Sequence, residues 1–266
     1  MCQSCGCGAG SKPEVETIKV LENLLAENDR LAGHVRHHFD DHGVFAINLM
    51  SSPGAGKTSL LEATIEALAG DIRIGVVEGD LETENDADRI RRHGVPAAQI
   101  TTGVACHLDA RMVHDALEAL PLEDLDLVFV ENVGNLVCPA DFDVGTHANV
   151  VLLSVTEGDD KPEKYPVIFR VADLVMITKT DLLPYLEEFD PARAEASLAK
   201  VRGDGAPMRV SRKTGDGMDA WTGWLKAQVA DHRKHHPKDG KAHTHAHHAH
   251  GDHEHGHHDH ERGSAA

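Results

Sequence analysis

The chain has 266 residues, and its 26 Lys and Arg against 44 Asp and Glu give a formal net charge of −18. Hydrophobic residues make up 41% of it, enough for one large or two small domains. The acidity disfavours nucleic-acid binding, which depends on Lys and Arg that displace counterions. No run approaches the roughly 20 apolar residues of a membrane helix, and no leader precedes Cys2. We therefore expect a cytoplasmic protein with neither membrane nor nucleic-acid partners.

The first residues, MCQSCGCGAG, contain Cys2, Cys5 and Cys7. Three thiolates so close together can wrap one soft or borderline metal ion. A C-x-x-C redox pair and incidental cysteines are the alternatives. A redox pair normally needs a helix N-terminus to lower a thiol pKa, and none is evident here. We predict a metal-binding segment over residues 1–12.

From Pro13 onward, apolar residues recur at three- and four-residue spacing, which predicts a helical segment over 13–43. Beyond it, apolar runs alternate with amphipathic stretches. The runs cover 44–50, 72–77, 125–133, 150–155, 174–178 and 208–210, and the helices are expected near 58–69, 84–93, 108–119, 192–202 and 217–230. Continuous apolar runs indicate strands buried on both faces, so 44–230 should form a doubly wound, mostly parallel α/β sheet. In such a sheet the loops at the carboxyl ends of the strands carry the chemistry.

The loop after the first run reads SSPGAGKT and fits the phosphate-binding pattern G-x-x-x-x-G-K-S/T, except that Ser51 replaces the first Gly. A chance Gly-rich turn is the alternative, but the strand–loop–helix context favours a P-loop. Backbone N–H groups and the helix N-terminus would then hold phosphate oxygens, the lysine would neutralise them, and the Thr58 hydroxyl would bind Mg²⁺. The expected nucleotide-binding residues are Gly54, Ala55, Gly56, Lys57, Thr58 and Ser59.

Two later loops favour guanine as the base. Thr178-Lys179-Thr180-Asp181 resembles the N-K-x-D motif with Thr in place of Asn. The Asp181 carboxylate can accept hydrogen bonds from both donors on the guanine edge, and the Lys179 stem would cover the base. Further on, Ser211-Arg-Lys resembles the loop that lies beside guanine in GTPases. Either match alone could be a surface turn, but their order after a P-loop favours GTP over ATP.

Two loops between these motifs are expected to sense the γ-phosphate. One holds Asp80, a plausible carboxylate near Mg²⁺, although the acids around it could simply start a helix. In the other, Glu131 could position a water, and Gly134 could offer its N–H to the phosphate. We assign catalytic roles to Lys57, Thr58, Asp80 and Glu131.

Cys106 and His107 follow a short run over 100–104, and Cys138 follows the segment over 131–137. Two thiolates and an imidazole at two strand ends form a usable ligand set for Zn²⁺ or Ni²⁺. Taken alone, a buried cysteine is more often a small hydrophobic residue. Cys138, however, lies four residues beyond Gly134, so nucleotide hydrolysis could move a metal ligand. A water or a residue from a second copy could complete a tetrahedral site.

Residues 231–266 are expected to form a disordered tail, because almost nothing in them is apolar. Imidazoles interleaved with Ala, Gly, Asp and Glu can hold several divalent ions weakly, with Ni²⁺ favoured over Zn²⁺. A purification tag is the alternative, but tags are usually homopolymers. The candidate ligands are His243, His245, His247, His248, His250, His253, His255, His257, His258 and His260.

These motifs together resemble one family. MCQSCGCG, SSPGAGKTSLLE, EGDLETENDADRI, CHLDA, ENVGNLVCPADFDVG, SVTEGDDKPEKYP and ITKTDLL are similar to segments of the hydrogenase nickel-incorporation GTPases, the HypB family of SIMIBI-class P-loop proteins. The resemblance spans roughly residues 1–226, although the His-rich segment often lies near the N-terminus in that family.

The resemblance implies a Mg²⁺-dependent GTPase that helps insert nickel into the large subunit of [NiFe]-hydrogenase. It implies a high-affinity nickel site at Cys2, Cys5 and Cys7, and a Ni/Zn site at a homodimer interface in the GTPase domain over 44–230. The implied partner is a small zinc-bearing nickel chaperone of the HypA type. A urease-type nickel GTPase and a nickel or zinc storage protein that only binds nucleotide are the alternatives.

Overall fold

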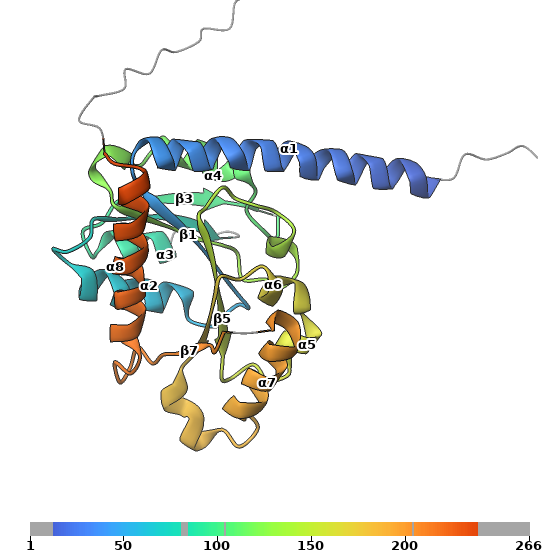
Figure 1. Cartoon of the computed structure of the whole chain (residues 1–266), viewed down its shortest axis with the longest axis vertical. Coiled ribbons are helices and arrows are strands. Elements are labelled where there is room, and N and C mark those ends of the chain that lie inside the picture. Colours follow the sequence, from blue (N-terminus) through green and yellow to red (C-terminus); the bar gives the residue numbers. More distant parts are fainter. Residues whose placement is uncertain (1–12, 81–84, 104, 204, 239–266) are drawn as a thin grey trace, which may run out of the picture.

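The computed structural model describes residues 13–80, 85–103, 105–203 and 205–238 (Figure 1). Its centre is a seven-stranded, entirely parallel sheet in the order β3-β2-β4-β1-β5-β6-β7. The strands are β1 (Phe45–Ser51), β2 (Ile74–Asp80), β3 (Ala97–Thr101), β4 (Leu127–Glu131), β5 (Ala148–Ser154), β6 (Leu174–Thr178) and β7 (Met208–Arg209). The predicted doubly wound parallel fold is confirmed.

Helices cover both faces of the sheet. The α-helices are α1 (Pro13–Asp41), α2 (Lys57–Leu68), α3 (Asn85–Arg91), α4 (Ala110–Leu117), α5 (Lys161–Lys164), α6 (Pro166–Arg170), α7 (Pro191–Arg202) and α8 (Met218–His235), and short 3-10 helices are η1 (Leu122–Asp124), η2 (Cys138–Ala140) and η3 (Thr180–Tyr185). In Figure 1, α8 lies beside α2, whereas α1 runs along α4 and extends beyond the sheet at its N-terminal end.

Alternating side chains of the central strands supply two cores. On one face, Ile47 of β1 and Phe129 of β4 pack against α2 and α8, where Trp221 is fully buried. On the other face, Ala46 and Val128 pack against α1 and α4. Because both faces are covered, every residue of β1 is buried, which is why its sequence reads as a continuous apolar run.

Two predictions about the elements need correction. β3 was not among the six predicted strands, because it lies at the sheet edge and its sequence, AAQIT, mixes polar with apolar residues. The tail was predicted to begin at 231, but α8 continues to His235, since Val229 and His232 still pack into the body of the protein. The predicted disorder of the rest of the tail falls on residues 239–266, outside the described part. Within the described residues, no helix has the length and apolar character needed to cross a membrane.

Candidate nucleotide and metal site

The P-loop lies between β1 and α2, as predicted. Gly54 and Gly56 have φ angles of 76° and 101°, which glycine adopts without strain, and Gly56 is the residue immediately before α2. The loop borders a cavity of 330 Å³, which is also lined by Asp80 at the end of β2 and by Gly134 after β4. The predicted phosphate-side residues therefore meet around one cavity.

Three of the predicted catalytic side chains are in contact. Glu131, at the carboxyl end of β4, is buried, and this burial raises the pKa of its carboxyl to about 7. Its Oε1 accepts a hydrogen bond from Thr58 Oγ1 at 3.0 Å and lies 3.9 Å from Lys57 Nζ. Lys57 Nζ also donates to Ser51 Oγ at 3.2 Å, so the residue that departs from the consensus Gly helps to position the lysine.

Glu78 is a second buried acid at this site, which sequence reasoning missed. It lies on β2 in register with Glu131, and burial followed by repulsion from Glu131 raises the pKa of Glu78 well above its usual value. The Oε2 atoms of both glutamates have no hydrogen-bond partner among the described residues. Unpaired carboxylate oxygens beside the Thr58 hydroxyl form a donor set that fits Mg²⁺. In the sequence, Glu78 stands directly after the apolar run over 72–77 and two residues before Asp80, which alone was singled out there.

The loop after β4 touches the P-loop directly. A Cβ built on Gly134 would lie 2.8 Å from Pro53 Cα and 2.9 Å from Pro53 N, so no larger residue fits without a shift of backbone. The next residue, Asn135, donates from Nδ2 to the backbone oxygen of Cys106 at 3.1 Å. The P-loop is thus connected through two adjacent residues to the segment that holds the predicted metal ligands.

A second cavity of 570 Å³ lies on the other side of the P-loop and is lined by Lys179 and Asp181. The Asp181 carboxylate accepts a hydrogen bond from Ser211 Oγ at 2.7 Å, which brings the two predicted base-side loops together. Thr178, which replaces the motif's Asn, donates from Oγ1 to Ala55 O at 2.8 Å. Lys179 Nζ donates to Gly54 O at 2.6 Å. Both residues therefore fasten the base-side loop to the P-loop.

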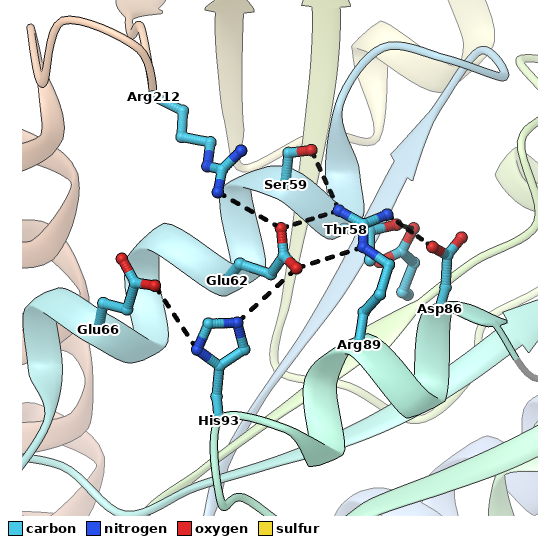
Figure 2. Close-up of polar contacts among 9 residues, drawn as sticks. Thr58, Ser59, Glu62, Glu66, Asp86, Arg89, His93 and Arg212 are labelled. Carbon is cyan, nitrogen blue, oxygen red and sulfur yellow. Dashed lines mark hydrogen bonds and ion pairs between the residues drawn. The ribbon is translucent and has the colours of Figure 1, made fainter.

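Arg89 of α3 lines the cavity beside the P-loop and was not predicted. Figure 2 shows its guanidinium between Glu62 and Asp86. It donates to Glu62 of α2 at 2.8 Å and to Asp86 at 2.7 Å. Burial opposes ionisation of Glu62, but the Arg89 hydrogen bonds lower the pKa of this carboxyl overall. Arg212, in the base-side loop, lies 3.7 Å from the same carboxylate. Glu62 therefore links the phosphate side of the site to the base side.

The predicted ligands Cys106, His107 and Cys138 lie together. The two Sγ atoms are 3.0 Å apart, His107 Nδ1 is 3.7 Å from Cys106 Sγ, and one ligand atom from each residue lies within 4.8 Å of the others. The His107 ring packs on Phe142 with centroids 4.0 Å apart, and burial lowers the pKa of this imidazole. A neutral imidazole beside two thiols is a ligand set for Zn²⁺ or Ni²⁺.

The remaining predicted ligands fall outside the described residues. These are Cys2, Cys5 and Cys7 near the N-terminus, and the ten histidines between 243 and 260. Their metal binding stays a prediction from the sequence.

A parallel α/β sheet with a P-loop after β1 and two cavities bordering that loop is the architecture of a P-loop nucleotide-binding protein. The family model for the CobW/HypB/UreG nucleotide-binding domain matches residues 45–206. A hydrogenase maturation factor HypB from Rhizobium leguminosarum bv. viciae is 50% identical over 213 residues, which cover 80% of this chain and 71% of the relative. The HypB of Escherichia coli K12 is 46% identical over 223 residues, 84% of this chain and 77% of the relative. The chain belongs to the HypB family of hydrogenase maturation factors, as the sequence motifs predicted.

Solved structures agree with this assignment. The crystal structure of HypB from Helicobacter pylori in complex with nickel has a TM-score of 0.74 and 38% identity to this chain, and the match covers 81% of this chain and 99% of that one. HypB from Archaeoglobus fulgidus has a TM-score of 0.72 and 42% identity, covering 77% and 99%.

Proposed function

We propose that this chain is a Mg²⁺-dependent GTPase that binds Ni²⁺, and also Zn²⁺, and passes nickel toward the large subunit of [NiFe]-hydrogenase during its maturation. The nucleotide state would control metal release. The observation that carries the proposal is the contact of Gly134 with Pro53, together with the Asn135 hydrogen bond to the segment of Cys106. A movement of the P-loop, or of a γ-phosphate bound to it, would be transmitted through Gly134 and Asn135 to the segment that holds the metal ligands.

Each residue of the site would have a distinct role in the proposed hydrolysis. Lys57 would neutralise phosphate charge, and Asp181 would select guanine. Thr58, Glu78 and Glu131 would hold Mg²⁺, which supplies charge neutralisation at the phosphates when it is bound. The Glu131 carboxylate would also position a water bound to the ion or the attacking water.

Ni²⁺ or Zn²⁺ would enter the Cys106, His107 and Cys138 set as cargo. Three ligands leave a tetrahedral ion one position short. Val137, next to Cys138, is 56% exposed, and an exposed apolar residue beside an incomplete metal site suits a homodimer in which the ion lies at the interface. Partnership with a HypA-type chaperone and with the hydrogenase rests on the family relationship.

Replacing Lys57 with Ala tests the enzymatic part. Loss of the phosphate-binding charge should lower GTP-dependent phosphate release at least 100-fold (about 3 kcal/mol). Nickel binding at Cys2, Cys5 and Cys7 should be unchanged. Lys226→Ala is the matched control, because Lys226 is exposed and pairs only with Asp71 among the described residues. Phosphate release that survives in Lys57→Ala would favour a storage protein that merely binds nucleotide.

A further inference from the structure

A second cluster of side chains of metal-binding types lies at the amino ends of the strands, away from the cavities beside the P-loop. It is formed by Asp40 at the end of α1, His147 just before β5, and His232 of α8, with ligand atoms within 4.8 Å of one another. His236, one turn beyond His232, adds a nitrogen 3.5 Å from the same carboxylate oxygen. Residues of two distant segments therefore converge on Asp40.

His147 is the positioning member of this cluster. Its Nδ1 accepts a hydrogen bond from the backbone N–H of Ala46 at 2.8 Å, so the proton of the neutral ring is on Nε2. That Nε2–H donates to Asp40 Oδ1 at 3.0 Å. A nitrogen that carries a proton cannot bind a metal, so His147 orients the carboxylate, as outer partners of metal ligands commonly do.

His232 is the member with an unsatisfied ring nitrogen. Its side chain is 7% exposed, and Nε2 has no hydrogen-bond partner among the described residues. A buried ring nitrogen without a partner is destabilising unless something binds it.

The spacing suits an ion better than hydrogen bonds. Asp40 Oδ1 is 3.7 Å from His232 Nε2 and 3.5 Å from His236 Nδ1, and both distances are longer than a hydrogen bond. They are close to the separation of about 3.3 Å between ligands of a tetrahedral ion with bonds of about 2.0–2.1 Å. The two imidazole rings are nearly parallel, with centroids 4.6 Å apart, so the half-exposed His236 ring would have to turn for both nitrogens to point at one ion.

We propose that Asp40, His232 and His236 bind a divalent transition ion such as Zn²⁺ or Ni²⁺, with water in the fourth position. Two imidazoles and one carboxylate are typical ligands of these ions. The ion would join the end of α1 to the end of α8, at the amino ends of β1 and β5. This site is separate from the nucleotide site and from the Cys106 set, so it goes beyond the proposed function.

Thermal unfolding with and without Zn²⁺ tests the site in the full chain carrying Cys106→Ser and Cys138→Ser. An ion that bridges two helices stabilises only the folded state, so Zn²⁺ well above its Kd should raise Tm by about 5 °C or more. Histidines between 243 and 260 can bind metal in the unfolded chain as well and should contribute little to this rise.

Three variants in that background decide the outcome. Asp40→Asn keeps the hydrogen bond from His147 but removes the carboxylate, and His236→Ala removes a half-exposed ring. Both should lose the Zn²⁺-induced rise in Tm, whatever their Tm without metal. His235→Ala is the matched control, because this neighbouring histidine is exposed and bonds the backbone of its own helix. The proposal is overturned if the background chain shows no rise, if Asp40→Asn or His236→Ala keeps it, or if His235→Ala loses it.

Discussion

Two buried glutamates, Glu78 and Glu131, face each other beside a single lysine in the phosphate cavity. Keeping two carboxylates out of water is unfavourable, and the raised pKa of each expresses this. A bound cation would offset that unfavourable term, because it would add positive charge beside the two carboxylates. The site is therefore arranged for a ligand that brings positive charge with its phosphates.

Gly134 lies in close contact with the backbone of Pro53 in the P-loop. Gly134→Ala places a methyl group less than 3 Å from the Pro53 backbone, so either the P-loop or the loop after β4 must shift. Overpacking of this kind commonly costs about 1–3 kcal/mol. We expect GTP affinity to fall at least 10-fold (about 1.4 kcal/mol), as measured by titration with a fluorescent GTP analogue.

Gly223→Ala is the control for that substitution. Gly223 lies in α8, and a methyl group added there would meet no described atom within 4 Å beyond the backbone of its own helix. Ala should therefore keep GTP affinity and stabilise the helix by about 0.5–1 kcal/mol. Equal GTP affinity in Gly134→Ala and Gly223→Ala would show that the contact with Pro53 is not needed for binding.

At the scale of elements, one buried carboxylate fastens the end of α8 to the sheet. Asp126, immediately before β4, is 3% exposed and receives two hydrogen bonds from the Arg73 side chain at 3.0 and 2.7 Å. Arg233 of α8 pairs with the same carboxylate at 2.5 Å. Burial opposes the charge, but the Arg73 hydrogen bonds outweigh it, and the pKa of Asp126 lies well below its usual value.

Asp126→Asn should destabilise the protein by about 1–3 kcal/mol at pH 7, as measured by urea unfolding, because it removes the charge and keeps the shape. The folded pKa of Asp126 is depressed, so its contribution is complete above the unfolded value of about 3.9 and is lost as pH falls below it. The difference between wild type and variant should therefore shrink at pH 3.

The exposed pair of Asp71 with Lys226 provides the comparison. Because both side chains are about half exposed, Asp71→Asn should change the free energy of unfolding by less than about 0.5 kcal/mol at pH 7. A loss in Asp126→Asn no larger than this, or one that is independent of pH, would contradict the role given to Asp126.

At the scale of the whole molecule, the two described clusters of candidate metal ligands lie apart. The two cavities beside the P-loop and the Cys106 set lie at the carboxyl ends of the strands, whereas the Asp40 cluster lies at their amino ends. Of the two clusters, only the Cys106 set lies next to a loop that contacts the P-loop. Nucleotide exchange should therefore change metal affinity at the Cys106 set and leave the Asp40 cluster unaffected.

Titration of Ni²⁺ into the chain with Cys2, Cys5 and Cys7 replaced by Ser tests this coupling. A protein loaded with a non-hydrolysable GTP analogue and one loaded with GDP should differ in affinity by about 5-fold or more at the Cys106 set, with mass measured alongside to follow dimerisation. Equal affinities would remove the link, because a ligand that binds two states alike shifts neither.

The sequence by itself determined the P-loop, the guanine-type motif and the alternation of strands and helices, because each depends on residues close together in the chain. It also placed Cys106 and Cys138 in loops that follow strands, and their two Sγ atoms proved to lie together. Where a pattern was weak, as in the edge strand β3, it was missed.

Only the tertiary structure decided which distant residues meet. Glu78 faces Glu131 because β2 pairs with β4. Asp40 meets His232 because α1 and α8 both end near the amino ends of the strands. Such contacts follow from how helices and strands pack, which local spacing does not encode. The same reason explains why α8 runs to His235: His232 is polar in sequence but buried in the fold.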